Sequence, residues 1–213
     1  MSDLTDKLDS IADEIRSNLT AKDAAREQAL PLCREAIRFS SQAIRAVHRQ
    51  EFEQTKKLLK SARDVLSQAE QALTGAPELS NTGFLMDAQK ECAEGYLLLS
   101  LVVKSPLPKP EDLGVDPAAY LNGLAEAASE LRRYLLDGIR KGDLSRAEEL
   151  LSAMDDVYNV LVTMDFPDAI TGGLRRTTDM LRGVLERTRS DLTLVIRQKE
   201  LENLLGKFEG NIK

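Results

Sequence analysis

The stretch VDPAAYLNGLAEAASELRRYLL, which spans Val115–Leu136, decides the fold class of this chain. Its apolar residues recur at spacings of three and four, which is the period of one face of an α-helix. They form a stripe made of Leu121, Leu124, Ala128, Leu131 and Leu135. Asp116 is a typical N-cap and Pro117 suits the first helical position, so the helix is expected to begin there. Glu126 and Glu130 lie off the apolar stripe, four residues apart.

A second pair of carboxylates, Glu91 and Glu94, lies near the start of KECAEGYLLLSLVV. On a helix, residues three or four apart are surface neighbours, with Cβ atoms about 5–6 Å apart. Two such pairs on adjacent helices could therefore bring four carboxylates to one divalent-metal site. The plainer alternative is a solvated polar face, because glutamate is an ordinary residue at exposed helix positions. The second pair also avoids the apolar stripe of its own helix, which consists of Leu85, Ala88, Cys92, Tyr96 and Leu99.

The rest of the chain shows the same helical periodicity and predicts seven helices and no strands. We expect them at about residues 4–19, 22–49, 51–73, 82–103, 117–141, 144–164 and 174–205. Pro31 lies inside the second pattern and is expected to kink that helix or to mark its true start. The one substantial loop, residues 104–115, is too short to link two domains. The sequence therefore predicts a single all-α domain over residues 1–213.

The composition argues against two common ways of binding nucleic acid. Five Phe, four Tyr and no Trp leave few aromatic side chains for a sheet that stacks bases. A formal charge of −6 argues against a surface that is basic throughout. A local basic patch remains open, because Arg34, Arg38 and Arg45 recur at spacings of four and seven. They form one stripe, which faces RNA, solvent or another subunit.

The cysteines and the N-terminus indicate the compartment. Cys33 and Cys92 form no C-x-x-C motif, and the opening MSDLTDKLDS is too acidic for a targeting peptide. No run approaches the roughly 18 apolar residues of a membrane span. We therefore expect a cytoplasmic protein with reduced cysteines in its core and no membrane association.

His48 is the single histidine, and this excludes several kinds of site. A two-histidine acid–base nuclease is impossible, and so is a di-iron bundle site with two Glu-x-x-His units. The usual His and Cys ligands of a zinc site are also too few. Any metal would be held by oxygen atoms, which favours Mg²⁺ or Mn²⁺. His48 itself is expected to be a packed or capping residue at a helix end.

Three segments of the chain resemble the translin family, and within it the translin-associated factor X type that assembles alone. They are REQALPLCREAIRFSSQAIRAVHR (26–49), VDPAAYLNGLAEAASELRRYLLDGIRKGDLSRAEELLSAMDDVYNVL (115–161) and LRRTTDMLRGVLERTRSDLTLVIRQ (174–198). The resemblance covers about residues 25–201. It implies a translin-like helical bundle of about seven helices that assembles into a hollow oligomer of about eight chains.

The resemblance also implies a metal-dependent endoribonuclease that uses four acidic residues. These match Glu91, Glu94, Glu126 and Glu130, although the best-known form of the family has Asp where Glu126 stands. Arg133 matches a family arginine. One departure concerns residues 81–84, which read NTGF where the family carries a basic, histidine-containing segment implicated in nucleic-acid binding.

The expected function is therefore hydrolysis of single-stranded RNA inside a hollow homo-oligomer. The four glutamates would be the metal ligands and catalytic groups for Mg²⁺ or Mn²⁺, and the arginines expected to contact RNA are Arg34, Arg38, Arg45 and Arg133. Two alternatives stay open. One is a non-catalytic translin-like oligomer that binds single-stranded RNA or DNA. The other is an all-α scaffold whose acidic face is only solvated.

Overall fold

The computed structural model describes residues 3–80 and 82–210, and within them the protein is all-α, as predicted. The helices are α1 (Asp3–His48), α2 (Phe52–Ala72), the 3₁₀ turn η1 (Pro77–Leu79), α3 (Gly83–Val103), α4 (Pro110–Leu113), α5 (Pro117–Arg140), α6 (Ala147–Leu161), α7 (Asp168–Thr171) and α8 (Leu174–Gly210). None of the described helices is long and apolar enough to cross a membrane.

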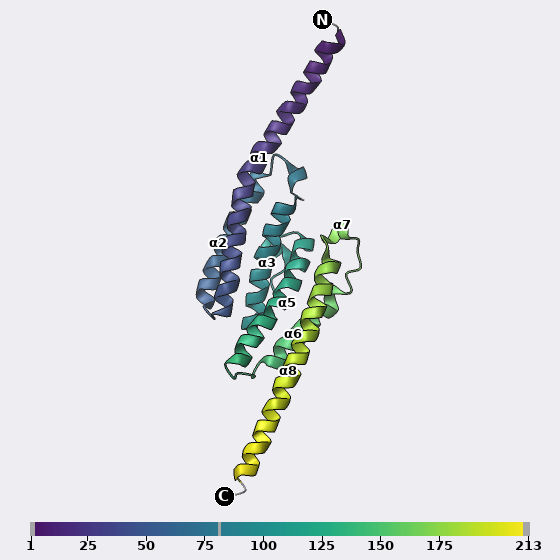
Figure 1. The fold of residues 1–213 in the computed structure, drawn as a ribbon. Coiled ribbons are helices and arrows are strands. Elements are labelled where there is room, and N and C mark those ends of the chain that lie inside the picture. Colours follow the sequence, from purple (N-terminus) through teal and green to yellow (C-terminus); the bar gives the residue numbers. More distant parts are fainter. Residues whose placement is uncertain (1–2, 81, 211–213) are drawn as a thin grey trace.

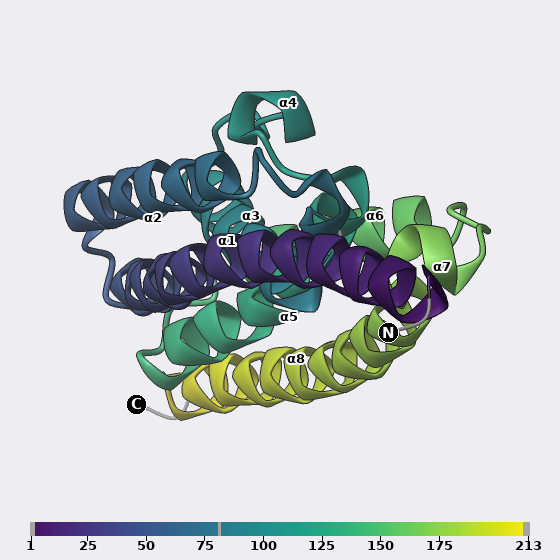
Figure 2. The ribbon, with the colours of Figure 1, turned by 90° about the horizontal axis from the view of Figure 1, so that it is seen from above.

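Helices α3 and α5 form the centre of the bundle (Figures 1 and 2). Helix α1 packs on α2 and α3, α3 packs on α5, and α5 is covered on its other sides by α6 and α8. The central position explains the sequence of α3, which is buried on most sides rather than along one stripe. Where α3 meets α5, Gly123 of α5 faces Ala93 and the Lys90 carbonyl of α3, and these small residues let the two backbones approach closely.

The first two predicted helices are one continuous helix, α1. Thr20 and Ala21 do not interrupt a helix, so nothing stops it between residues 19 and 22. Pro31 lies inside α1 without starting it. Its missing N–H leaves the Glu27 carbonyl without a helical partner, but both residues are exposed, so water can satisfy that oxygen. The expectation that a separate helix begins near residue 22 or at Pro31 was wrong.

The other difference lies in the connections. Short helices α4 and α7 and the turn η1 occupy segments that were expected to be loops. Pro110 begins α4 and Gly114 ends it with φ 59°, a left-handed conformation that favours glycine. The described residues thus form six long helices and three short ones instead of seven.

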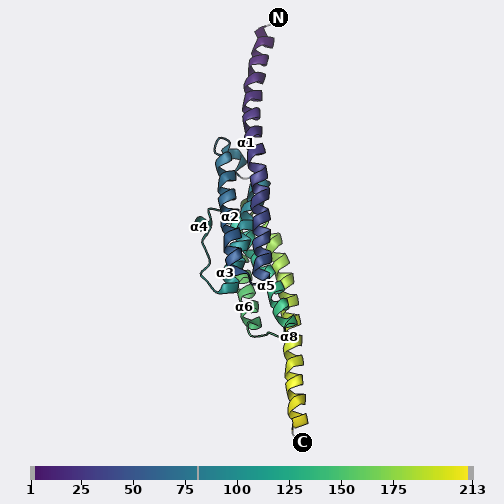
Figure 3. The same cartoon turned by 90° about the vertical axis from the view of Figure 1, so that its left-hand side faces the viewer.

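The two ends of the chain extend beyond the bundle in opposite directions (Figures 1 and 3). Every side chain of α1 from residue 4 to residue 21 is exposed, and so is every one of α8 from residue 197 to residue 208. The exposed part of α1 carries a stripe of large apolar residues, Leu4, Leu8, Ile11, Ile15 and Leu19. We call these five residues the N-terminal stripe.

The cysteines behave as the sequence suggested. Cys33 and Cys92 are buried and unbonded to each other. Burial raises the pKa of the Cys33 thiol to about 11 and that of the Cys92 thiol to about 12. Both thiols therefore stay protonated at neutral pH and act as small core residues.

Candidate metal centre

The close contact between α3 and α5 places the acidic residues. A Cβ atom added to Gly123 of α5 would lie only 2.7 Å from the carbonyl oxygen of Lys90 and 3.0 Å from the nitrogen of Glu94. The start of α5 is also fixed to α3, because the Asp116 backbone N–H donates to Gln89 Oε1 at 3.1 Å. The Asp116 side chain caps the new helix by accepting from the N–H of Ala118. The two helices therefore meet in one fixed register.

Three of the four expected carboxylates converge at this contact. Ligand oxygens of Glu91, Glu94 and Glu126 all lie within 4.8 Å of one another. We call these residues the three-carboxylate cluster. The burial of Glu94 was not expected from its position off the apolar stripe of its helix: the residue is only 7% exposed. The reason is that α3 is covered on several sides in the bundle, so avoiding its apolar stripe does not lead to solvent.

The cluster is electrostatically unfavourable for the chain alone. Burial is the main reason that the pKa of Glu94 is raised to about 9, and the negative charges of Glu91, Glu126 and Glu130 add to it. Burial also raises the pKa of Glu91, against the opposing charge of Lys90. Carboxylates in this situation hold protons or attract a cation. Their oxygen atoms are the ligands that Mg²⁺ and Mn²⁺ prefer.

Lys90 supplies a cation at the edge of the cluster, and sequence reasoning missed it. Its Nζ lies 2.9 Å from Glu126 Oε1, and both side chains are partly buried. Burial acts to lower the pKa of Lys90, but the hydrogen bond with Glu126 and the nearby carboxylates raise it overall. The only sequence signal was its position next to Glu91, and a lysine beside a glutamate on a helix is too common to be informative.

Glu130, the fourth expected carboxylate, is engaged elsewhere. It lies one turn after Glu126 on α5, and its Oε2 is 2.6 Å from Nε2 of His48, the last residue of α1. This hydrogen bond lowers the pKa of Glu130 and outweighs the opposite effect of burial. His48 is buried at a helix end, as expected. Its contact with Glu130, 82 positions away, could not be read from helical spacing.

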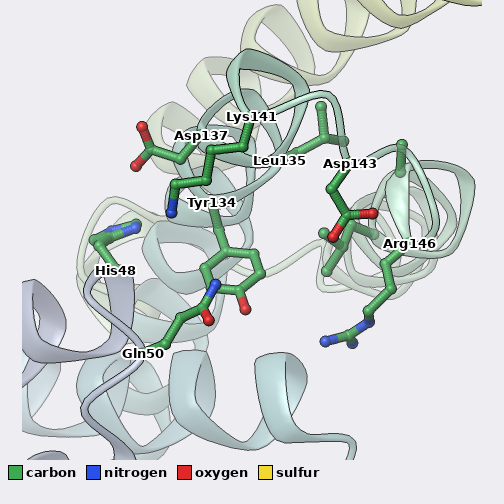
Figure 4. Close-up of a pocket in the computed structure, with 11 residues that line it drawn as sticks. His48, Gln50, Tyr134, Leu135, Asp137, Lys141, Asp143 and Arg146 are labelled. Carbon is green, nitrogen blue, oxygen red and sulfur yellow. The ribbon is translucent and has the colours of Figure 1, made fainter.

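Several hollows adjoin these residues along α5, and two of them lie on either side of the His48–Glu130 contact. A groove of about 600 Å³ is lined by Lys90, Glu94, Glu126, Ser129, Glu130, Gly172, Gly173, Arg176, Thr177, Met180 and Val184. This groove lies between α3, α5 and the start of α8, and we call it the acidic groove. A smaller cavity of about 80 Å³ follows on the next turns of α5, where His48, Gln50, Tyr134 and Lys141 line it (Figure 4). His48 therefore stands between the acidic groove and this cavity.

The arginines expected to contact RNA are exposed, as such a role requires. Arg34, Arg38 and Arg45 lie on α1, where Arg38 pairs with Glu35 at 2.8 Å. Arg133 is exposed on α5, and its charge contributes to the low pKa of Glu130. Their contact with RNA stays a prediction. In the segment 81–84, which lacks the family's basic residues, Asn81 lies outside the described residues and Thr82 precedes α3.

Neighbouring Arg132 has a different role. It donates to Thr188 Oγ1 at 3.2 Å and to Asp191 Oδ2 at 2.7 Å, both on α8. These bonds hold α5 to the last helix, so Arg132 is occupied within the bundle.

Comparison with known proteins supports the fold. No family model matches the chain. A structure of AfC3PO in complex with duplex RNA is 33% identical, covers 88% of this chain and 97% of that one, and superposes with a TM-score of 0.77. A second AfC3PO crystal structure is 32% identical over the same share of this chain, with a TM-score of 0.76. The apo-NeC3PO structure, at 18% identity and a TM-score of 0.74, shows the shared fold alone. An uncharacterized protein of Methanocaldococcus jannaschii is 28% identical over 193 residues, which are 90% of this chain and 85% of that protein.

Proposed function

This chain belongs to the translin-like family of the C3PO structures, and from that premise we propose that it is a metal-dependent endoribonuclease. One observation carries the proposal: three carboxylates converge beside a groove, in a fold whose relative AfC3PO forms a complex with duplex RNA. The resemblance to the translin family implies the same chemistry. It assigns Glu91, Glu94, Glu126 and Glu130 to the reaction.

The residues of the cluster fit a hard divalent cation. Glu91, Glu94 and Glu126 present oxygen ligands close enough to share one ion. Burial and, after it, the neighbouring carboxylates raise the pKa of Glu94, and a bound cation would offset both effects by stabilising the ionised form. Bound Mg²⁺ or Mn²⁺ would supply a Lewis acid that polarises the phosphate and acidifies a water. Lys90 and Arg176 line the acidic groove and would hold the phosphates of the strand by charge-assisted hydrogen bonds.

The proposed substrate is single-stranded RNA, and the proposed partner is a set of identical subunits. A homo-oligomer of about eight chains, as the family resemblance implies, would enclose the acidic groove and admit only short or threaded strands. Arg34, Arg38, Arg45 and Arg133 are the candidate RNA contacts. A second candidate function is binding of RNA or DNA without cleavage, which the RNA complex of AfC3PO supports equally well.

Cleavage of an end-labelled single-stranded RNA separates these functions. We expect cleavage with Mg²⁺ or Mn²⁺ and none with EDTA. Glu94→Gln and Glu126→Gln keep the shape of the side chain but remove the charge that binds the metal. We expect each to lose activity by at least about a hundredfold. Glu148→Gln, at an exposed position of α6, is the matched control and should cleave like the parent. RNA binding without cleavage under all conditions would support the non-catalytic function instead.

A further inference from the structure

Glu130 differs from the other three glutamates in what it contacts. Glu91, Glu94 and Glu126 lie together, whereas Glu130 Oε2 is bonded to His48 Nε2 at 2.6 Å. A carboxylate can only accept, so Nε2 carries the proton and His48 is the donor. Glu130 nevertheless lines the acidic groove, and its side chain is 32% exposed. Its second oxygen can therefore reach a bound substrate while Oε2 accepts the hydrogen bond from His48.

A histidine at position 48 would lower the stability of the protein if it served only for packing. Its side chain is 3% exposed, and its Nδ1 is buried without a hydrogen-bond partner among the described residues. A buried polar atom without a partner lowers stability. An apolar side chain of similar size would fill the same space without that cost. Among the residues that the structure describes, His48 therefore makes its hydrogen bond through Nε2, to Glu130.

We propose that His48 is a positioning residue that holds Glu130 as the proton acceptor of the reaction, outside the set of metal ligands. This inference rests on the proposed ribonuclease function. The water oxygen forms a bond to phosphorus while one water proton passes to the Glu130 carboxylate. The bond from phosphorus to the leaving oxygen breaks, and that oxygen takes a proton from solvent. The His48 bond fixes the rotamer of Glu130, so that its second oxygen faces the water.

Metal binding without RNA tests the role of Glu130. Isothermal titration calorimetry measures the Mn²⁺ affinity of each variant. It shows which residues bind the metal, independently of activity. We expect Glu130→Gln to bind Mn²⁺ within about threefold of the parent, and to lose about 10²–10⁴-fold in kcat as a missing general base would. Glu94→Gln should lose Mn²⁺ binding. If Glu130→Gln also loses it, Glu130 is a metal ligand and this inference fails while the ribonuclease survives. If the parent itself cleaves nothing, the proposed function fails first.

Two substitutions test the role of His48. His48→Leu removes the donor and also the unpaired Nδ1, so we expect an unchanged or higher Tm, unchanged Mn²⁺ binding and a kcat at least tenfold lower at a similar KM. His48→Gln offers an amide N–H near the position of Nε2 and should recover most of the lost kcat. The inference is overturned if His48→Leu cleaves like the parent. It is also overturned if both variants lose Tm and activity together, which would show that His48 is structural.

Discussion

Glu94 shows how a single residue couples stability to the site. Its pKa is raised from an ordinary value of 4.5 to about 9, first by burial and then by three neighbouring carboxylates. Between these two pH values the folded chain binds a proton that the unfolded chain has released. The contribution of Glu94 to stability is therefore complete below pH 4.5 and is lost as pH rises towards 9. A cation bound at the cluster would remove this penalty by stabilising the ionised form.

The first prediction concerns this pH dependence. The Tm of the metal-free protein should fall from pH 5 to pH 9 more steeply in the parent than in Glu94→Gln, because glutamine does not ionise. Differential scanning calorimetry of both proteins in EDTA measures the two slopes. The prediction concerns their difference, because groups distant from the three-carboxylate cluster titrate equally in both proteins and cancel. Parallel curves would show that Glu94 ionises without cost in the folded protein.

The second prediction concerns Lys90, whose ammonium pairs with Glu126. Lys90→Met removes a positive charge that competes with a metal ion for the same carboxylate. We expect Mn²⁺ to bind about two- to fivefold more tightly, which corresponds to the usual size of a partly exposed ion pair. Lys60→Met, at an exposed position of α2, should leave Mn²⁺ affinity unchanged. Weaker binding in Lys90→Met would mean that the lysine holds Glu126 in its binding geometry.

At the scale of elements, helical spacing predicted the helices well and their boundaries less well. It placed Glu91, Glu94 and Glu126 on two helices that do meet, because spacing fixes which residues share a face. It did not show that the helices are buried on several sides, so the burial of Glu94 was missed. It also divided α1 at a stretch where no residue actually ends a helix. The His48–Glu130 bond depends on how α1 crosses α5, which a periodic pattern does not contain.

The third prediction concerns the contact of α3 with α5. Gly123→Ala places a methyl group 2.7 Å from the Lys90 carbonyl, and a helix backbone cannot move aside as a flexible side chain can. We expect a loss of about 1–3 kcal/mol in the free energy of unfolding and weaker Mn²⁺ binding, because the cluster spans this contact. Denaturant unfolding and calorimetry measure the two effects.

Gly183→Ala on α8 is the matched control, since the added Cβ would meet only the end of the Arg187 side chain at 3.5 Å. This variant should gain up to about 1 kcal/mol from the higher helix propensity of alanine, with Mn²⁺ binding unchanged. A Gly123→Ala protein as stable as the parent would show that α3 and α5 can separate without cost.

At the scale of the whole molecule, the bundle buries only part of α1 and only part of α8. The N-terminal stripe is 54–65% exposed in the single chain, and α8 carries exposed Leu201, Leu204, Leu205 and Phe208 near the opposite end. Regularly spaced apolar residues on an exposed helix mark a surface that another chain covers. Closed symmetric assembly is the usual way in which identical chains cover such surfaces.

The fourth prediction is that the N-terminal stripe holds the oligomer together. Eight copies of a 23.6 kDa chain would give a mass of about 190 kDa by light scattering, and a closed assembly should keep that mass on dilution. The double variant Ile11→Glu, Ile15→Glu should shift the mass to smaller species, because burying two carboxylates in an apolar contact is costly. Loss of the assembly should lower the Tm, but the separated chain should still fold, since neither side chain is buried within its own chain. The control double variant Ser10→Glu, Ser17→Glu adds the same charge on the opposite face of the helix and should leave the oligomer intact.

A parent protein that is monomeric at micromolar concentration would contradict the assembly. Equal dissociation of both double variants would show that added charge, rather than loss of the apolar stripe, separates the subunits.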